Sequence, residues 1–86
     1  MKRNPNVVWD VVDGVTVLCH TGSGDLFDLN VTAAFVWTTC ERRSIQDLVE
    51  ALREEYPDVS REILEADCRD LIASFEENDL LEDTGG

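Results

Sequence analysis

The sequence has few basic residues. Its 86 residues include 7 Lys and Arg against 19 Asp and Glu, which gives a formal net charge of −12. Binding to nucleic acids and attachment to anionic membranes both depend on clustered Lys and Arg side chains. The shortage of cations therefore argues against nucleic acid and membrane partners. A cationic peptide or protein would instead be attracted to this surface.

Histidine, cysteine and long apolar segments are also scarce. The chain has one His and three Cys, and it contains no apolar run of the 18 residues that a membrane span needs. The Met-Lys-Arg start is not followed by the apolar segment of a signal peptide. Cys19, Cys40 and Cys68 are widely spaced and odd in number, so we expect reduced, structural thiols in a cytoplasmic protein.

The residue types that carry chemistry do not form a recognisable site. Structural zinc sites usually contain a Cys pair two to four residues apart, and this sequence has none. Cys19 and His20 are neighbours on an expected strand, so their side chains point to opposite faces. They cannot readily share a metal or act as nucleophile and base. The carboxylates are spread along helix surfaces. We therefore expect no catalytic activity, metal or other cofactor.

The composition is sufficient for one small folded domain. Hydrophobic residues make up 43% of the chain, which is too many for a disordered protein, and the length allows a single core. We expect residues 1–6 to be flexible, residues 7–81 to form the domain and residues 82–86 to be a disordered tail.

The first part of the domain has the pattern of a β-hairpin. Asp13-Gly14 separates two segments rich in β-branched residues, and this dipeptide favours a two-residue turn. Such a turn pairs Val12 with Val15 and, at the far end, Val7 with His20. Both faces of the hairpin carry apolar residues, so the pattern leaves open which face is the core.

A third short strand is expected at Asp25–Leu29, after a turn over residues 21–24. Alternation places Phe27 and Leu29 on one face and Leu26 and Asp28 on the other. The last strand of a meander has an unpaired edge unless another segment covers it, and its two Asp residues would discourage pairing with a second copy. An open edge of this kind can accept another peptide as an added strand.

Three helices are expected after this strand. Asn30 is a suitable N-cap for the first, which reaches about Cys40. Its expected apolar repeat consists of Val31, Ala34, Phe35 and, less regularly, Thr38, with Trp37 alongside. Ser44 is expected to cap a second helix that ends at Pro57. Ser60 would cap the third and longest helix, which reaches about Asn78 and whose expected buried stripe is Leu64, Cys68, Leu71 and Phe75.

The order of these segments resembles the PqqD-like family, over about Val8 to Leu81. The resemblance rests on Asp13-Gly14 with its following strand, Gly24-Asp25-Leu26-Phe27-Asp28-Leu29-Asn30, Ala33-Ala34-Phe35-Val36-Trp37, Ser44-Ile45 to Tyr56, Ala66-Asp67-Cys68, Leu71-Ile72 and Leu80-Leu81. One departure is Asn78-Asp79, where the family usually has a Gly. The resemblance implies an α+β fold in which a three-stranded antiparallel sheet is followed by three helices, in a winged-helix-like arrangement.

The resemblance also implies a function. Such domains bind the leader of a ribosomally made, modified peptide as a strand beside the third strand and against the third helix. A chain of this length is most similar to the B1 component of lasso-peptide synthesis, whose partners are the precursor leader, a B2-like cysteine protease and a cyclase. The candidate peptide-binding residues are Asp25, Leu26, Phe27, Asp28 and Leu29 on the strand, and Ile63, Asp67, Asp70, Leu71 and Ser74 on the third helix. The choice of the Asp67 flank over the Ile72 flank is a hypothesis, and Leu71 can equally be a core residue.

Other classes share single features with this sequence. A winged-helix transcription regulator has the same outline, but the third helix offers only Arg61 and Arg69 as cations. The charge alone would also suit a protein mimic of DNA. Gly85-Gly86 invites comparison with ubiquitin-like carriers, which do not place all their strands before their helices. We therefore take peptide recognition as the leading interpretation and the transcription regulator as the alternative.

Overall fold

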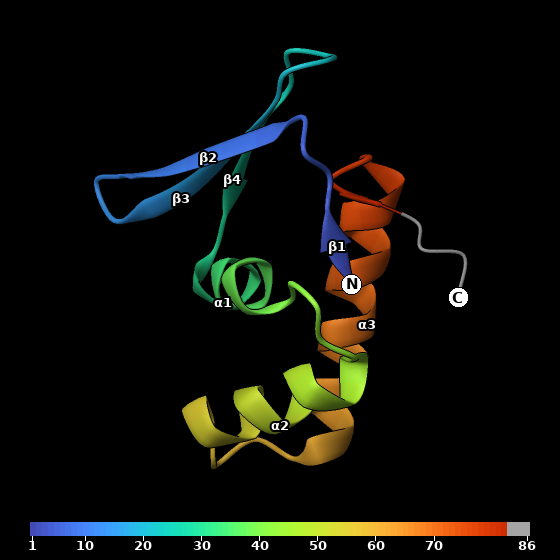
Figure 1. Ribbon diagram of the computed structural model, residues 1–86. Coiled ribbons are helices and arrows are strands. Elements are labelled where there is room, and N and C mark those ends of the chain that lie inside the picture. Colours follow the sequence, from blue (N-terminus) through green and yellow to red (C-terminus); the bar gives the residue numbers. More distant parts are fainter. Residues whose placement is uncertain (83–86) are drawn as a thin grey trace.

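The computed structural model describes residues 1–82 and contains a three-stranded antiparallel sheet followed by three helices (Figure 1). In chain order, these strands and helices are β2 (Val7–Val12), β3 (Val15–His20), β4 (Leu26–Leu29), α1 (Val31–Thr39), α2 (Ile45–Glu55) and α3 (Arg61–Glu77). The predicted α+β fold class is confirmed. Within the described residues, no helix is both long and apolar enough to cross a bilayer.

The hairpin of β2 and β3 has the predicted register, from Val12 opposite Val15 to Val7 opposite His20. Asp13 and Gly14 have φ angles of 52° and 80°, as a tight turn with two left-handed residues requires. The structure also decides which face is the core. Leu18 and His20 are buried, whereas Val8 and Val12 on the opposite face are 55% and 56% exposed. The sheet therefore covers the core with one face and leaves the other open.

Residues 1–6 were expected to be flexible, but the structure pairs part of this segment with a strand near the other end of the described chain. β1 (Lys2–Arg3) pairs antiparallel with β5 (Leu81–Glu82), and the Asn4 N–H donates to the Leu80 carbonyl at 2.9 Å. The pairing joins residues about eighty positions apart, so no local pattern could indicate it. Of the expected tail, Glu82 lies in β5, and residues 83–86 lie outside the described residues.

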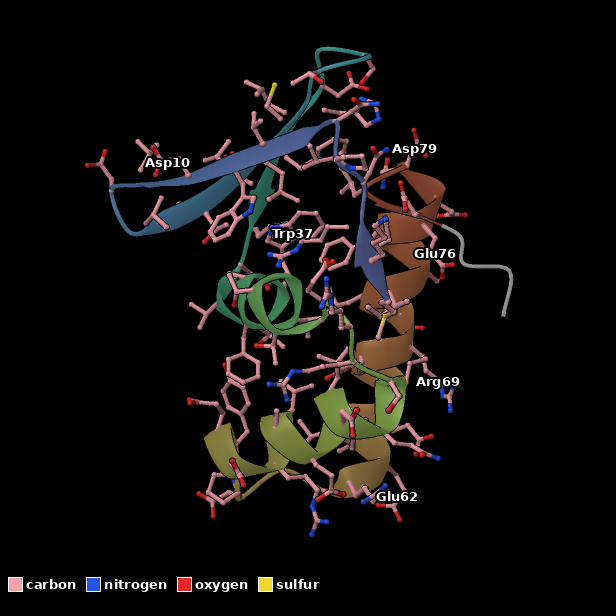
Figure 2. The ribbon with its side chains drawn as sticks, viewed as in Figure 1. Asp10, Trp37, Glu62, Arg69, Glu76 and Asp79 are labelled. Atoms are coloured by element: carbon pink, nitrogen blue, oxygen red, sulfur yellow. The ribbon has the colours of Figure 1, made fainter. Side chains whose placement is uncertain are left out.

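Helix α1 buries a different face from the one predicted. Its core residues are Ala33, Val36 and Trp37, whereas Val31 is 77% exposed. The helix is apolar almost all round, so its own periodicity does not choose a face. Packing against α3 decides the orientation, because the Trp37 ring meets the Phe75 ring edge to face with centroids 5.5 Å apart. Figure 2 shows Trp37 in the interior, between the sheet and α3.

Helices α2 and α3 begin at the predicted caps. Ser44 and Asp47 form a reciprocal capping box, and the Ser60 side chain accepts the N–H of Ile63. The buried stripe of α3 is Leu64, Cys68, Ile72 and Phe75. Ile72 therefore takes the core position predicted for Leu71, which is half-buried on the neighbouring flank. The two stripes differ by a small rotation of the helix about its axis, which the sequence pattern does not fix.

Candidate peptide-binding site

Strand β4 is an edge of the sheet. The strand order is β2-β3-β4, so within residues 1–82 β4 pairs with β3 alone and its other side is open. This confirms the predicted edge.

The register shows which main-chain groups face the open side. The His20 N–H donates to the Asp25 carbonyl at 3.0 Å, and Leu18 and Thr16 lie opposite Phe27 and Leu29. Hydrogen-bonded pairs alternate with non-bonded pairs along an antiparallel ladder. Leu26 and Asp28 are therefore the strand residues that direct their N–H and C=O groups toward the open edge.

The side chains of β4 divide between the two faces of the sheet. Phe27 and Leu29 are half-buried and pack against the core. Leu26 is 68% exposed, and it shares the outer face with Asp28, opposite Cys19 and Val17 of β3. The side chains of Leu26 and Asp28 therefore lie on the outer face, away from the core. What they offer an added strand is their main chain.

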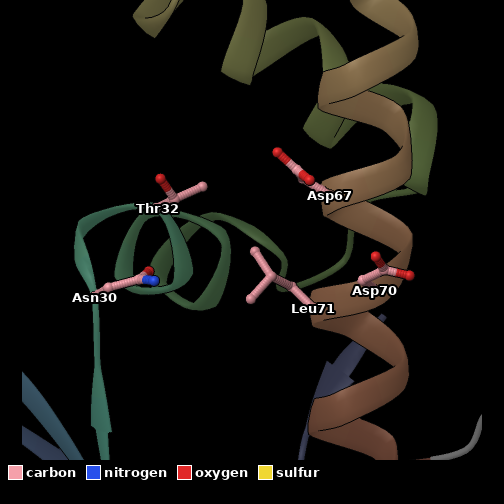
Figure 3. Close-up of a pocket in the computed structure, with 5 residues that line it drawn as sticks. All are labelled: Asn30, Thr32, Asp67, Asp70 and Leu71. Atoms are coloured by element: carbon pink, nitrogen blue, oxygen red, sulfur yellow. The ribbon is translucent and has the colours of Figure 1, made fainter.

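A pocket of about 370 Å³ lies where β4 ends and α1 begins (Figure 3). It is lined by Asn30, Thr32, Asp67, Asp70 and Leu71. Figure 3 shows Asp67 and Leu71 pointing from α3 toward the first turn of α1. The structure thus brings together three of the residues proposed for the third helix. Ile63 and Ser74 are exposed on α3 but do not line this pocket.

Asn30 and Thr32 were not among the predicted site residues. Asn30 has a structural role that explains its presence, because its Oδ1 accepts the Ala33 N–H at 2.8 Å and caps α1. The only available signal was position, since both residues follow directly from the edge strand and so lie at the end of any peptide added to it.

The pocket combines apolar surface with negative charge. Leu71 contributes the half-buried apolar side chain, and Asp67 and Asp70 contribute carboxylates that form no ion pair within residues 1–82. The two arginines of α3 are engaged elsewhere, because Arg61 pairs with Glu50 and Arg69 with Glu65. A ligand that enters this pocket therefore meets an acidic surface whose charge is not neutralised.

The cysteines and the histidine do not form a chemical centre in the described residues. His20 is buried while Cys19 is on the outer face, as adjacent strand residues must be. Burial raises the pKa of the Cys40 and Cys68 thiols, which keeps them protonated and unreactive. No group of three His, Cys, Asp or Glu side chains in this part of the chain is arranged to hold a metal ion.

The fold and the matches to known proteins identify a RiPP recognition element, which is a non-catalytic peptide-binding domain. The chain belongs to the PqqD family: residues 15–81 match the sequence profile described as coenzyme PQQ synthesis protein D (PqqD). No curated protein matches the sequence significantly.

Two solved structures are similar over almost the whole chain. One is TbiB1 in complex with the TbiA(beta) leader peptide, with a TM-score of 0.86 and 31% sequence identity over 95% of each chain. The other is a lasso peptide synthetase B1 complexed with the leader peptide, with a TM-score of 0.83 and 30% identity over 95% of this chain and 96% of that one. Both relatives carry a leader peptide.

Proposed function

We propose that this protein binds the leader of a ribosomally synthesised precursor peptide, in particular a lasso peptide, and presents it to a leader peptidase and a cyclase. The leader adds as a strand along the open edge of β4, and one of its side chains enters the pocket between α1 and α3. The observation that carries the proposal is the open edge itself, which ends at that pocket.

The two parts of the site make different contributions to binding. Main-chain hydrogen bonds to Leu26 and Asp28 supply affinity that is independent of the leader's sequence, and the pocket supplies selectivity. The carboxylates of Asp67 and Asp70 favour a leader segment that carries Lys or Arg close to an apolar residue. The overall charge of −12 steers such a peptide toward the domain before contact.

The outer face of the sheet is the surface that we assign to the peptidase, a B2-like cysteine protease. Val8, Val12 and Leu26 expose apolar surface on this face, which also has a hollow of about 250 Å³ between β2 and β3. Contiguous exposed apolar surface is characteristic of protein interfaces. An added leader strand would extend this face beside Leu26, so a partner docked there would contact the domain and its bound leader together.

The alternative is a winged-helix transcription regulator. Its third helix would have to approach phosphate groups, yet both arginines of α3 are already paired with glutamates and the helix surface is acidic. The free thiols of Cys19, Cys40 and Cys68 suit the reducing cytoplasm, where we propose that the protein acts.

Fluorescence anisotropy tests the proposal. The first probe is a fluorescein-labelled leader taken from any short open reading frame found near this gene, and the second is the TbiA(beta) leader peptide. Saturable binding of the first probe, competed by its unlabelled form, is the expected result. Absence of binding to both leaders would overturn the proposal. Binding of duplex DNA at low salt would favour the transcription regulator instead.

A further inference from the structure

The end of α3 has an unusual residue at a position that normally requires glycine. The Leu80 N–H donates to the Phe75 carbonyl at 2.8 Å and the Asp79 N–H to the Glu76 carbonyl at 3.1 Å, which is the Schellman pattern of helix termination. The pattern places Asp79 in the left-handed region, with φ of 59°. A residue with a side chain is strained there relative to glycine. The presence of Asp79 therefore suggests that its side chain is needed.

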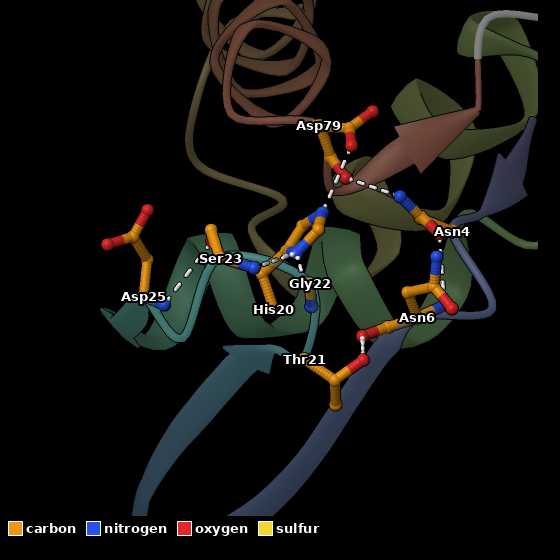
Figure 4. A network of polar contacts seen from close by, with 8 residues as sticks. All are labelled: Asn4, Asn6, His20, Thr21, Gly22, Ser23, Asp25 and Asp79. Carbon is orange, nitrogen blue, oxygen red and sulfur yellow. Dashed lines mark hydrogen bonds and ion pairs between the residues drawn. The ribbon is translucent and has the colours of Figure 1, made fainter.

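That side chain contacts His20, the last residue of β3, which precedes the turn into β4 (Figure 4). Asp79 Oδ2 lies 3.0 Å from Nε2 of His20, whose side chain is almost fully buried. The Asp79 main-chain carbonyl also accepts from Asn4 Nδ2 at 2.8 Å. One residue thus connects the end of α3 with the end of β3 and with the N-terminal segment.

The contacts of the His20 ring fix its tautomer. Nδ1 accepts the N–H of Gly22 at 3.1 Å and the N–H of Ser23 at 3.2 Å, so it carries no proton in this arrangement. The proton of the neutral ring is then on Nε2, which donates to Asp79.

The same ring shapes the turn that leads into β4. The Gly24 N–H donates to the His20 carbonyl at 2.7 Å and the His20 N–H to the Asp25 carbonyl at 3.0 Å, directly before Leu26. The ring lies so close to the turn that a Cβ on Gly22 would be 2.9 Å from its Cε1 atom. His20 therefore holds the turn before β4 both through its ring and through its main chain.

We propose that Asp79 and His20 are positioning residues for the binding edge: Asp79 holds the neutral imidazole of His20, and the imidazole holds the turn that aligns β4 with α3. The inference rests on the proposed function.

Two substitutions at position 79 separate positioning from simple structural support. Asp79→Gly removes the contact with His20 and relieves the left-handed strain, so we expect the melting temperature to be retained while leader affinity falls about tenfold. Asp79→Asn keeps an oxygen that accepts from Nε2 and tolerates the left-handed backbone. It should therefore restore leader affinity to near the wild-type value. Glu54→Gln, on the exposed surface of α2, controls for the lost charge.

The measurements are anisotropy with the labelled leader that binds in the test of the proposed function, thermal unfolding, and NMR of the ligand-free protein. The NMR spectra should show the Gly22 and Ser23 amide signals shifting in Asp79→Gly relative to the wild type. Unchanged affinity in Asp79→Gly, or a loss that parallels a loss of stability, would overturn the proposal. If the wild type binds no leader, the proposed function fails, and the two amide signals still decide whether Asp79 and His20 hold the turn.

Discussion

Leu18 of β3 lies directly opposite Phe27 of β4, and both side chains face the core. This pair determines which main-chain groups of the edge strand point outward. Since Phe27 uses its main-chain groups for β3, its neighbours Leu26 and Asp28 direct theirs outward. A single register thus defines both the packing of the sheet and the groups available to a peptide.

Replacing Asp28 by proline tests the edge directly. Asp28→Pro removes an outward N–H without removing a bond to β3, and proline is tolerated on an edge strand in this orientation. We expect leader affinity to fall about tenfold or more in anisotropy, because one main-chain hydrogen bond and its neighbours' geometry are lost. The thermal unfolding temperature should change little.

Two controls accompany this variant. Asp28→Ala retains the N–H and should bind the leader within about threefold of the wild type, which separates the main chain from the carboxylate. Phe27→Pro removes a bond within the sheet and should destabilise the fold by about 3 kcal/mol. Wild-type affinity in a folded Asp28→Pro protein would exclude strand addition at β4.

A charge reversal in the pocket tests how the leader is selected. Asp67→Lys replaces a pocket carboxylate with a cation, so a leader segment bearing Lys or Arg should bind about five- to fifty-fold more weakly. Asp58→Lys changes the net charge equally in the loop before α3, away from the pocket, and should have a much smaller effect. Equal effects of the two variants at low salt, both disappearing at high salt, would mean that only long-range steering is involved.

The sequence predicts best what short-range chemistry determines. The turn at Asp13-Gly14 has only one good backbone solution, and it fixed the register of β2 and β3 through to His20. Asn30 and Ser44 have side chains that satisfy open N–H groups, so they marked the starts of α1 and α2. The edge at β4 followed from the order of the strands.

The parts that could not be predicted depend on distant contacts. The pairing of Arg3 with Leu81 has no local signal, and the buried face of α1 is chosen by Trp37 meeting Phe75. Distant packing also explains why Ile72 occupies the core position that the sequence pattern predicted for Leu71. This difference matters for the site, because Leu71 is then available to line the pocket. The acidic flank of α3 was proposed from sequence, but only the structure showed that Asn30 and Thr32 line the pocket with it.

The outer face of the sheet can be tested separately from leader binding. Leu26→Asp adds a charge to the exposed apolar surface while leaving the main chain of β4 intact, so leader affinity should remain within about threefold of the wild type. Cleavage of the precursor by the proposed B2-like peptidase should slow about tenfold or more, because a charge at an apolar interface is left unpaired. Val59→Asp, in the loop between α2 and α3, is the matched control. The assignment of the two faces is wrong if Leu26→Asp binds the leader much more weakly than the wild type does, and if the peptidase still cleaves at the wild-type rate when the variant is saturated with precursor.

The pairing of Glu41 with Arg3 should make the docking of the N-terminal segment dependent on pH. Glu41 Oε2 accepts from the Arg3 main-chain N–H at 2.9 Å and from its Nε at 3.2 Å, and the main-chain bond is the largest cause that holds the Glu41 pKa below its ordinary value of 4.5. A lowered pKa in the folded state means that the ionised carboxylate stabilises the fold above the ordinary value and that this contribution is lost as the pH falls through the folded-state pKa. Glu41→Gln should therefore lower the free energy of unfolding at about pH 7 by on the order of 1 kcal/mol, a figure reduced for the partial exposure of the pair. Urea denaturation at decreasing pH should show the difference from the wild type shrinking as Glu41 itself becomes protonated, with Glu54→Gln as the control. A difference that persists unchanged into acid would show that the side chain acts through its shape instead of its charge.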